Sequence, residues 1–212
     1  MKIYPIDTIT EDVRTVLDMN KSGGTLALLG DADTLSAKEI IRSKIIEAVK
    51  AVHCAAPAYL VDGGYNFGDA IYWQELGGGY VILPEDFMRF IVFEMDDWDR
   101  AVFEAIDVNN PKYKRQSSRF KGIRGSSQKP ICAISWRPEG RVLEFYSSKS
   151  TNAKVKRASY LPYPSIDFND GIEICERCYN AVLYSIAALV CITYGENDKA
   201  NIFNEISKSS LI

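Results

Sequence analysis

The spacing of the hydrophobic residues changes twice along the chain, and this constrains the fold more than any single motif. Up to Pro57 they recur at helical spacing, over 71–164 they form short runs rich in aromatic and β-branched residues, and after 170 the helical spacing returns. A segment with one period does not sit stably in the other element. We therefore expect an α+β protein: a helical bundle, made of N-terminal helices plus a long C-terminal helix, interrupted by an antiparallel β-sandwich or barrel-like module. The expected parts are residues 1–70, 71–164 and 165–212.

The N-terminal part predicts two helices, each opened by a capping box. Residues 8–11 (Thr-Ile-Thr-Glu) and 36–39 (Ser-Ala-Lys-Glu) have the required Ser or Thr three positions before Glu. Leu35 and Ile40 are placed to act as a hydrophobic staple for the second helix, which Pro57 limits. The first helix is expected to end at Asn20 and the glycines that follow it. The two apolar stripes are Ile9, Val13, Val16 and Leu17, and Ile41, Ile45, Ala48, Val49 and Val52.

The middle part predicts about six short strands, which suits a small antiparallel sandwich or barrel. The sequence Arg-Pro-Glu-Gly at 137–140 separates two apolar runs and is typical of a hairpin turn. Three consecutive glycines at 77–79 are expected to join two earlier strands. The runs expected to form strands are 80–83, 90–95, 101–106, 131–136 and 142–146.

The C-terminal part predicts a long helix followed by a shorter one. Between Ala181 and Ile192 the segment is apolar nearly all round, which is typical of the central helix of a bundle. The apolar run is about 14 residues long, short of the roughly 20 that a bilayer requires, so we expect no membrane partner. Gly195 ends this helix, and residues 200–206 begin the next one. The residues expected on one face of the long helix are Cys175, Cys178, Val182, Ile186, Leu189 and Tyr194.

The single histidine, His53, argues against most hydrolytic chemistry, because triads and histidine-rich metal sites would all have to use this one residue. Cys175 and Cys178 form the one CxxC pair, but a zinc site needs four ligands and there is no second pair. We expect these cysteines to be core residues, and His53, at the end of the second predicted helix, to be a capping or core residue. The odd number of cysteines, five, indicates reduced thiols. We therefore expect no enzyme, and no catalytic, cofactor-binding or metal-binding residues.

The charged residues of the middle part are segregated. Residues 85–107 contain eight acids and two arginines, whereas 108–137 contain eight basic residues and no acid, and a further basic cluster lies at 149–157. Three interpretations are open: two solvated faces with a mobile basic loop, a strip that binds nucleic acid, or a basic face that meets the acidic face of an identical neighbour. The net charge of −3 favours the neighbour over nucleic acid.

Two features of this charged region bear on those interpretations. The connection 110–129 is longer than an ordinary loop, and such loops are either disordered or ordered by a partner. The acids Glu94, Asp96, Asp97 and Asp99 lack the glycine-punctuated spacing of a calcium loop. We interpret them as turn carboxylates rather than metal ligands.

Two local stretches carry a resemblance to a known family. Residues 80–90 (YVILPEDFMRF) run as a strand, Leu-Pro, an acidic residue and then arginine, and residues 186–203 run as a closing helix, a Tyr-Gly-Glu turn and a terminal helix. Together with the order of the parts, they resemble the head-to-tail adaptor proteins of short-tailed bacteriophages, also called connector or tail-tubular proteins, which form portal-docking rings. In its general character the sequence is similar to proteins of crAss-like phages.

The resemblance implies a structural virion protein, assembled in the cytoplasm of a host bacterium. By resemblance its copies, about twelve, form a closed ring under the portal. The ring would extend the DNA channel and dock the next tail or ring protein. From the charge segregation, the residues expected at the subunit interface are Asp96, Asp97, Asp99, Arg115, Arg119, Lys121 and Arg124. By resemblance, the residues expected to dock on the portal are Phe203, Ile206, Leu211 and Ile212.

Two other functions stay open. The first is a nucleic-acid-binding module, in which the basic region 112–157 binds phosphates while Tyr113, Phe120 and Trp136 stack on bases. The second is an enzyme with an unrecognised carboxylate site. A connector ring would also be compatible with non-specific contact with the genomic DNA in its channel.

Overall fold

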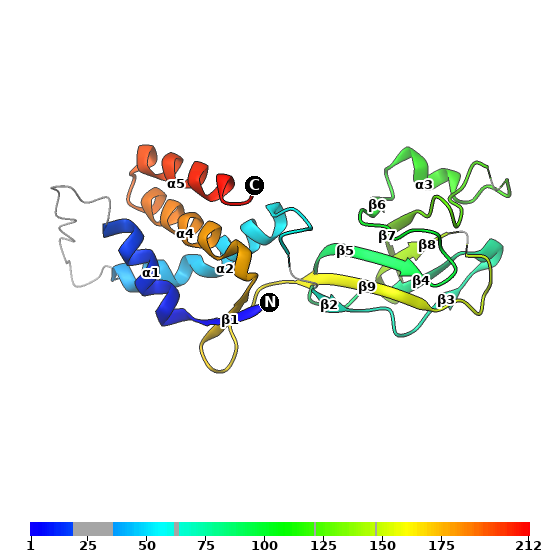
Figure 1. Ribbon diagram of the computed structural model, residues 1–212, viewed down its shortest axis with the longest axis horizontal. Helices are drawn as coiled ribbons and strands as arrows, with labels where there is room; N and C mark the ends of the chain where they lie inside the picture. Colours follow the sequence, from blue (N-terminus) through cyan, green and yellow to red (C-terminus); the bar gives the residue numbers. More distant parts are fainter. Residues whose placement is uncertain (19–35, 62–63, 121, 147) are drawn as a thin grey trace. The chain divides into compact units, whose positions relative to one another are not determined.

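The computed structural model describes residues 1–18, 36–61, 64–120, 122–146 and 148–212. The chain forms two compact units, coloured by sequence in Figure 1. We call them the helical unit, Met1–Asp62 with Pro164–Ile212, and the β unit, Gly63–Tyr163. The fold is α+β, as expected, with both ends of the chain in the helical unit and the sheets in the middle of the sequence. The β unit begins earlier in the sequence than the expected residue 71.

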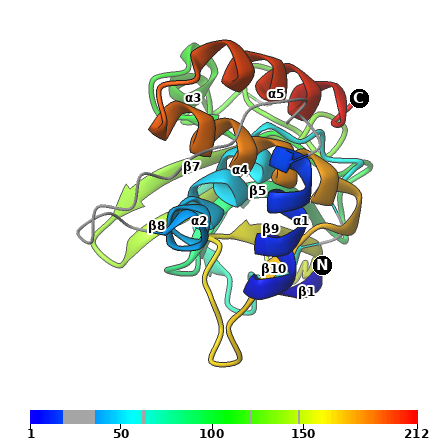
Figure 2. The same cartoon turned by 90° about the vertical axis from the view of Figure 1, so that its left-hand side faces the viewer.

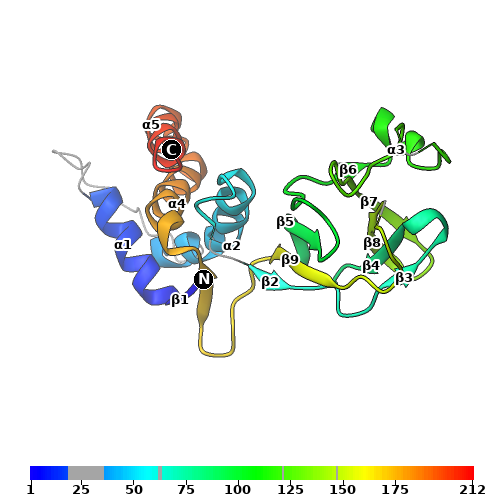
Figure 3. The same ribbon diagram turned by 45° about the vertical axis from the view of Figure 1, so that its right-hand side comes forward.

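The helical unit is built around its most apolar helix. It contains α1 (Ile6–Asp18), α2 (Ala37–Ala55), α4 (Tyr179–Thr193) and α5 (Asn197–Ser209). Helix α4 packs against each of the other three, and Figures 1 and 3 show it between α5 and the α1–α2 pair. Ile186 of α4 and Ile45 of α2 are fully buried. The expected central helix is therefore confirmed.

One of the two predicted capping boxes is present and the other is wrong. At α2, Ser36 Oγ accepts from the Glu39 N–H at 3.3 Å, and the Glu39 carboxylate accepts from the Ser36 N–H at 2.7 Å. Helix α1 begins at Ile6, so Thr8 lies inside it. The Ile6 N–H donates instead to the carbonyl oxygen of Asp170, at 2.9 Å, so a segment distant in sequence caps α1. Leu35, Asn20 and the glycines after Asn20 lie outside the described residues.

Two short strands of the helical unit were not predicted. Strand β1 (Lys2–Pro5) pairs antiparallel with β10 (Gly171–Ile174). Elements of four residues are too short to show a period in the sequence. The face predicted for the long helix also needs correction. Leu189 is only half-buried whereas Val190 is buried, because a helix that is apolar all round does not reveal which side faces its neighbours.

In its described residues, the β unit contains two sheets and one short helix. One sheet has the strand order β2-β9-β5 and the other β3-β4-β8-β7-β6. The strands are β2 (Tyr65–Asn66), β3 (Tyr72–Trp73), β4 (Gly79–Ile82), β5 (Phe87–Met95), β6 (Ile106–Asp107), β7 (Cys132–Arg137), β8 (Gly140–Phe145) and β9 (Val155–Pro162), with a 3₁₀ turn at Glu75–Gly77 and the helix α3 (Pro111–Arg115).

Aromatic side chains join the two sheets. Phe93 of β5 stacks on Phe145 of β8 with ring centroids 5.5 Å apart, and Trp98 meets both rings edge-on. Phe67 and Tyr160 extend this cluster, with centroids 6.0 Å apart. All five residues are buried. Aromatic pairs of this kind add to the stability that burial alone supplies.

The strand predictions for the β unit are partly confirmed. The hairpin turn at 137–140 is present, since Arg137 pairs with Gly140 across β7 and β8, and the glycines at 77–79 do join β3 to β4. The run 101–106 is not a strand: Val102 makes an isolated bridge to Phe93, and β6 pairs parallel with β7. Strand β9 was missed, because its first half is basic and exposed and only its second half is apolar.

Among the described residues, every helix is too short or too polar to pass through a lipid bilayer.

Candidate subunit-contact groove

An open groove in the β unit lies between two segments that are distant in sequence. Its larger chamber has a volume of about 860 Å³ and lies between residues 73–78 on one side and residues 113–117 with Arg124 on the other. A second chamber of about 410 Å³ continues toward residues 148–151 and shares Leu76 and Arg124 with the first. We call the two chambers together the Arg124 groove. Cavities of this size accept a drug-sized molecule or a short peptide segment.

The larger chamber contains a buried carboxylate, that of Glu144 on β8. Glu144 accepts hydrogen bonds from Ser135 Oγ at 2.8 Å, from Arg137 Nη2 at 2.8 Å, from Tyr113 OH at 3.1 Å and from Tyr146 OH at 2.5 Å. Its side chain is 7% exposed, so these donors take the place of water. The result is a satisfied ionic centre that ties α3, β7 and β8 together.

Opposing effects act on the pKa values of this centre. Burial alone would raise the pKa of Glu144, but the hydrogen bonds from Tyr146, Arg137, Ser135 and Tyr113 together hold it below its ordinary value. Burial raises the pKa of Tyr146 and of Tyr113, and the neighbouring carboxylate raises both further. Glu144 is therefore ionised and both phenols are protonated at neutral pH.

Arg137 connects this centre to the opposite side of the groove. Its guanidinium lies over the ring of Tyr80, 4.3 Å from the centroid. With the Gln74 amide in the orientation that satisfies both side chains, Arg137 donates to the amide oxygen at 2.7 and 2.9 Å. Charge-assisted bonds to fixed partners hold a guanidinium in one geometry. These contacts therefore hold Arg137, Gln74 and Glu144, which line the larger chamber, in fixed positions.

The long connection at 110–129 is folded over part of its length. Asn110 caps α3, and the buried amide of Gln116 donates to the Lys112 carbonyl and accepts from the Gly125 N–H, both at 2.8 Å. An isolated bridge joins Ser126 to Lys129. These contacts place Arg124 in both chambers. Its Nε is buried and has no hydrogen-bond acceptor within the described part of the chain.

The acids predicted at the subunit interface bind their own β unit. Asp97 accepts from Ser148 Oγ at 2.6 Å and from the Lys149 and Ser150 N–H groups, and Asp96 accepts from the Lys154 N–H at 3.0 Å. Asp99 pairs with Lys149 at 3.3 Å, and Glu94 with Lys156 at 2.7 Å. These acids are turn carboxylates, as interpreted from the sequence, and they also anchor residues 148–156. Their role toward a neighbour stays a prediction.

The basic residues predicted at the interface differ in exposure, and their role toward a neighbour stays a prediction. Arg115 and Arg119 are exposed, Arg124 is half-buried in the groove, and Lys121 lies outside the described residues. Sequence reasoning missed Glu144 and Gln116. An isolated acid on the strand after the Pro-Glu turn was the one signal for Glu144, and nothing in the sequence singled out Gln116.

The residues predicted to dock on the portal have unequal exposure. Phe203 and Leu211 are buried in the helical unit, and Ile206 is half-buried. Only Ile212 is fully exposed, and its carbonyl accepts from Tyr59 OH at 3.3 Å. Helix α5 continues to Ser209, and Leu211 packs in the core beyond it. Phe203 and Leu211 stabilise the fold and offer no surface in this structure.

The cysteine pair and the histidine are core residues, as predicted. Cys175 and Cys178 are fully buried, and Cys175 Sγ donates to the Leu60 carbonyl at 2.8 Å. His53 is buried, and its Nε2 accepts from the Cys175 N–H at 3.2 Å. Within the described ranges, no three histidine, cysteine or acidic side chains gather in a way that could hold a metal ion.

Comparison with known proteins adds no relative: no family model matches the chain, and no curated protein matches it.

Proposed function

We propose that this protein is the subunit of a head-to-tail connector ring in a bacteriophage virion. One observation carries the proposal: both ends of the chain build the helical unit, and the β unit is inserted between Asp62 and Pro164. This is the order of parts on which the resemblance to the adaptor proteins rests. In the virion the ring would dock on the portal, extend the DNA channel and receive the next tail or ring protein.

The surface of the chain supports this proposal physically. Copies close into a ring through two different surfaces of the same molecule, used head to tail. The β unit offers a preformed groove in which the Arg124 Nε has no acceptor among the described residues, and the helical unit offers exposed apolar side chains, such as Ile202 and Ile212. Exposed ion pairs contribute about 0–1 kcal/mol each, so they would set the register of a ring more than its stability.

The test is assembly of the purified full chain, alone and with the portal protein of the same phage. Negative-stain images should show rings, or rings that form only on the portal, and the mass should correspond to about twelve copies. Arg115→Glu with Arg119→Glu should leave the monomer folded and weaken assembly. A chain that stays monomeric and does not bind the portal would exclude the connector role.

The alternative is a nucleic-acid-binding module, which one observation favours. Phe120 and Trp136, which are 73% and 78% exposed, lie in the sequence region that carries the cations Arg115 and Arg119. Aromatic rings beside cations can stack on bases of single-stranded nucleic acid. This function predicts that the monomer binds DNA with an affinity that falls steeply with salt, and that Trp136→Ala weakens binding.

A further inference from the structure

A short hairpin of the helical unit presents a bare aromatic ring. Residues 165–171 connect to β10 and turn back on themselves, with a bridge between Ile166 and Ile172. The carboxylate of Asp167 accepts from the N–H groups of Asn169 at 2.9 Å and Gly171 at 2.7 Å, and its own N–H donates to the Gly171 carbonyl at 2.8 Å. These bonds give the tip one conformation.

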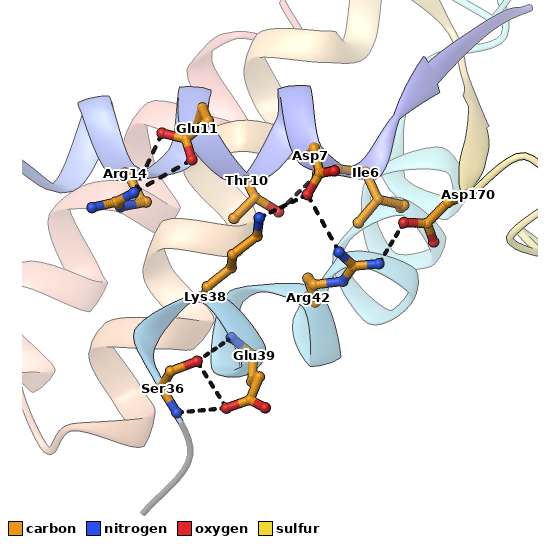
Figure 4. A network of polar contacts seen from close by, with 10 residues as sticks. All are labelled: Ile6, Asp7, Thr10, Glu11, Arg14, Ser36, Lys38, Glu39, Arg42 and Asp170. Carbon is orange, nitrogen blue, oxygen red and sulfur yellow. Dashed lines mark hydrogen bonds and ion pairs between the residues drawn. The ribbon is translucent and has the colours of Figure 1, made fainter. Parts of the chain in front are cut away.

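The base of the hairpin is fixed to two helices, as Figure 4 shows. The carbonyl of Asp170 caps α1, and its carboxylate pairs with Arg42 of α2. Arg42 also reaches Asp7 of α1, at 3.3 Å, and Lys38 pairs with Asp7 at 2.9 Å. In Figures 1 and 2 the loop before β10 stands away from the helices of this unit. The hairpin is therefore an ordered projection of the unit.

Phe168, at the tip of this projection, is completely exposed, with a relative accessibility of 109%. A single exposed apolar residue is common on protein surfaces. This one differs because it is held outward by a hydrogen-bonded turn, so little conformational entropy would be lost when it enters a pocket. The segment 164–171 carries two acids and no basic residue. Asp170 is paired with Arg42, so Asp167 is the acid that accompanies the ring.

The Arg124 groove has the complementary properties. Its larger chamber offers the apolar surfaces of Trp73, Leu76 and Tyr113, and the cations Lys114 and Arg124. It is also lined by two acids, Glu75 and Glu144, of which Glu144 is paired with Arg137. The buried Nε of Arg124 lacks an acceptor among the described residues, and a buried donor of this kind is normally satisfied by a partner or by water. A chamber of about 860 Å³ exceeds what one phenylalanine ring fills and suits the tip of a hairpin.

We propose that the hairpin of one copy inserts Phe168 into the Arg124 groove of the next copy. The Phe168 ring would lie among Trp73, Leu76 and Tyr113, while Asp167 faces the guanidinium of Arg124. The inference rests on the proposed ring, for which it names the two surfaces in contact. Because hairpin and groove are different parts of the chain, the contact repeats head to tail and closes into a ring or continues as a filament.

Photo-cross-linking tests this contact directly. A benzophenone amino acid replaces Phe168 in the full chain, and ¹⁵N-labelled and unlabelled copies are mixed, with and without portal protein, before irradiation. We expect cross-linked peptides that join a labelled copy to an unlabelled one through residues 73–78, residues 113–117 or Arg124. Cross-links confined to one copy, to the portal or to residues outside the groove would overturn the proposal.

A pair of complementary variants provides the second test. Phe168→Ala removes the ring and Arg124→Glu repels the hairpin, so each variant alone should lose tenfold or more in self-association. A mixture of the two retains one intact hairpin and one intact groove, so it should form 1:1 pairs and nothing larger. The matched controls, Phe103→Ala and Arg100→Glu, change exposed residues outside the groove lining and should assemble as the unchanged chain does.

These outcomes separate the contact from the proposed function. If the unchanged chain forms rings and Phe168→Ala forms them equally well, the contact is wrong and the ring stands. If position 168 cross-links to the groove of another copy but no ring forms on the portal, the contact stands and the connector role fails. Circular dichroism of each variant confirms that a loss of association is not a loss of fold.

Discussion

The two units have cores of different kinds. The helical unit is filled by aliphatic and small side chains, such as Ile45, Ile186 and Ala187, with one buried imidazole. The β unit is filled by stacked aromatic rings around Phe93 and Phe145, and it buries a carboxylate at its groove. The buried side chains of the first unit recur at helical spacing along single helices. Those of the second unit lie on different strands and loops and meet only when distant segments pair. The two cores should therefore respond differently to substitution. Tryptophan fluorescence reports on the β unit, and the helical signal in circular dichroism reports on the helical unit.

The largest effect is expected for Phe145→Ala in the β unit. The ring is fully buried and contacts Phe93, Trp73 and Trp98, so its removal leaves a cavity and should cost about 3–5 kcal/mol. All three tryptophans of the chain lie in the β unit, so the denaturant transition followed by their fluorescence should shift. The helical signal in circular dichroism should shift less. Equal shifts in both signals would show that the units unfold as one.

The corresponding change in the helical unit is Ile186→Ala. It should lower the free energy of unfolding by about 2–5 kcal/mol, measured by circular dichroism. Ile186 is fully buried at the centre of α4. Leu189→Ala, on the same helix, serves as the matched control, because Leu189 is half-buried and its loss should cost less. If Leu189→Ala destabilises the protein as much as Ile186→Ala, the packing of α4 described above is incorrect.

Glu144→Gln should change how the stability of the β unit, but not that of the helical unit, depends on pH. At neutral pH it weakens the bonds from Arg137 and the two tyrosines, at a cost of about 1–3 kcal/mol. The folded-state pKa of Glu144 lies below the ordinary value of 4.5, so its contribution to stability is present above that pH and is lost as the pH falls through the folded-state pKa. The fluorescence transition of the unchanged chain should therefore weaken below about pH 4.5, and more steeply than that of Glu144→Gln. Identical pH profiles would exclude an ionised Glu144.

The smallest of these effects is expected for Ser36→Ala, which removes the side-chain acceptor of the capping box of α2. The free energy of unfolding should fall by about 0.5–2 kcal/mol, measured from the helical signal in circular dichroism. Thr8→Ala is the control at the capping box that the structure does not contain, and it should change stability by less than about 0.5 kcal/mol. A larger loss for Thr8→Ala than for Ser36→Ala would reverse the assignment of the two helix starts.

The amino-acid sequence by itself determined the α+β class, the position of α2 with its cap, the turn between β7 and β8, and the central place of α4. The backbone hydrogen bonds of a helix join residues four apart, and a two-residue turn joins neighbours, so their signals lie within a short window of sequence. The same reasoning placed His53 and the cysteine pair in the core. It misplaced the start of α1, because the donor at that helix end is satisfied by Asp170, far along the chain.

Tertiary structure alone decided the parallel pairing of β6 with β7, the burial of Leu211, the anchoring of residues 148–154 by Asp96 and Asp97, and the groove beside Glu144. Each joins residues that are distant in sequence, so no local period records it. The charge segregation was visible from the start, but which charges meet depends on strand pairing. The physical reason is one of range: helix formation depends on near neighbours, whereas a sheet, a buried carboxylate and a groove exist only after distant segments have met.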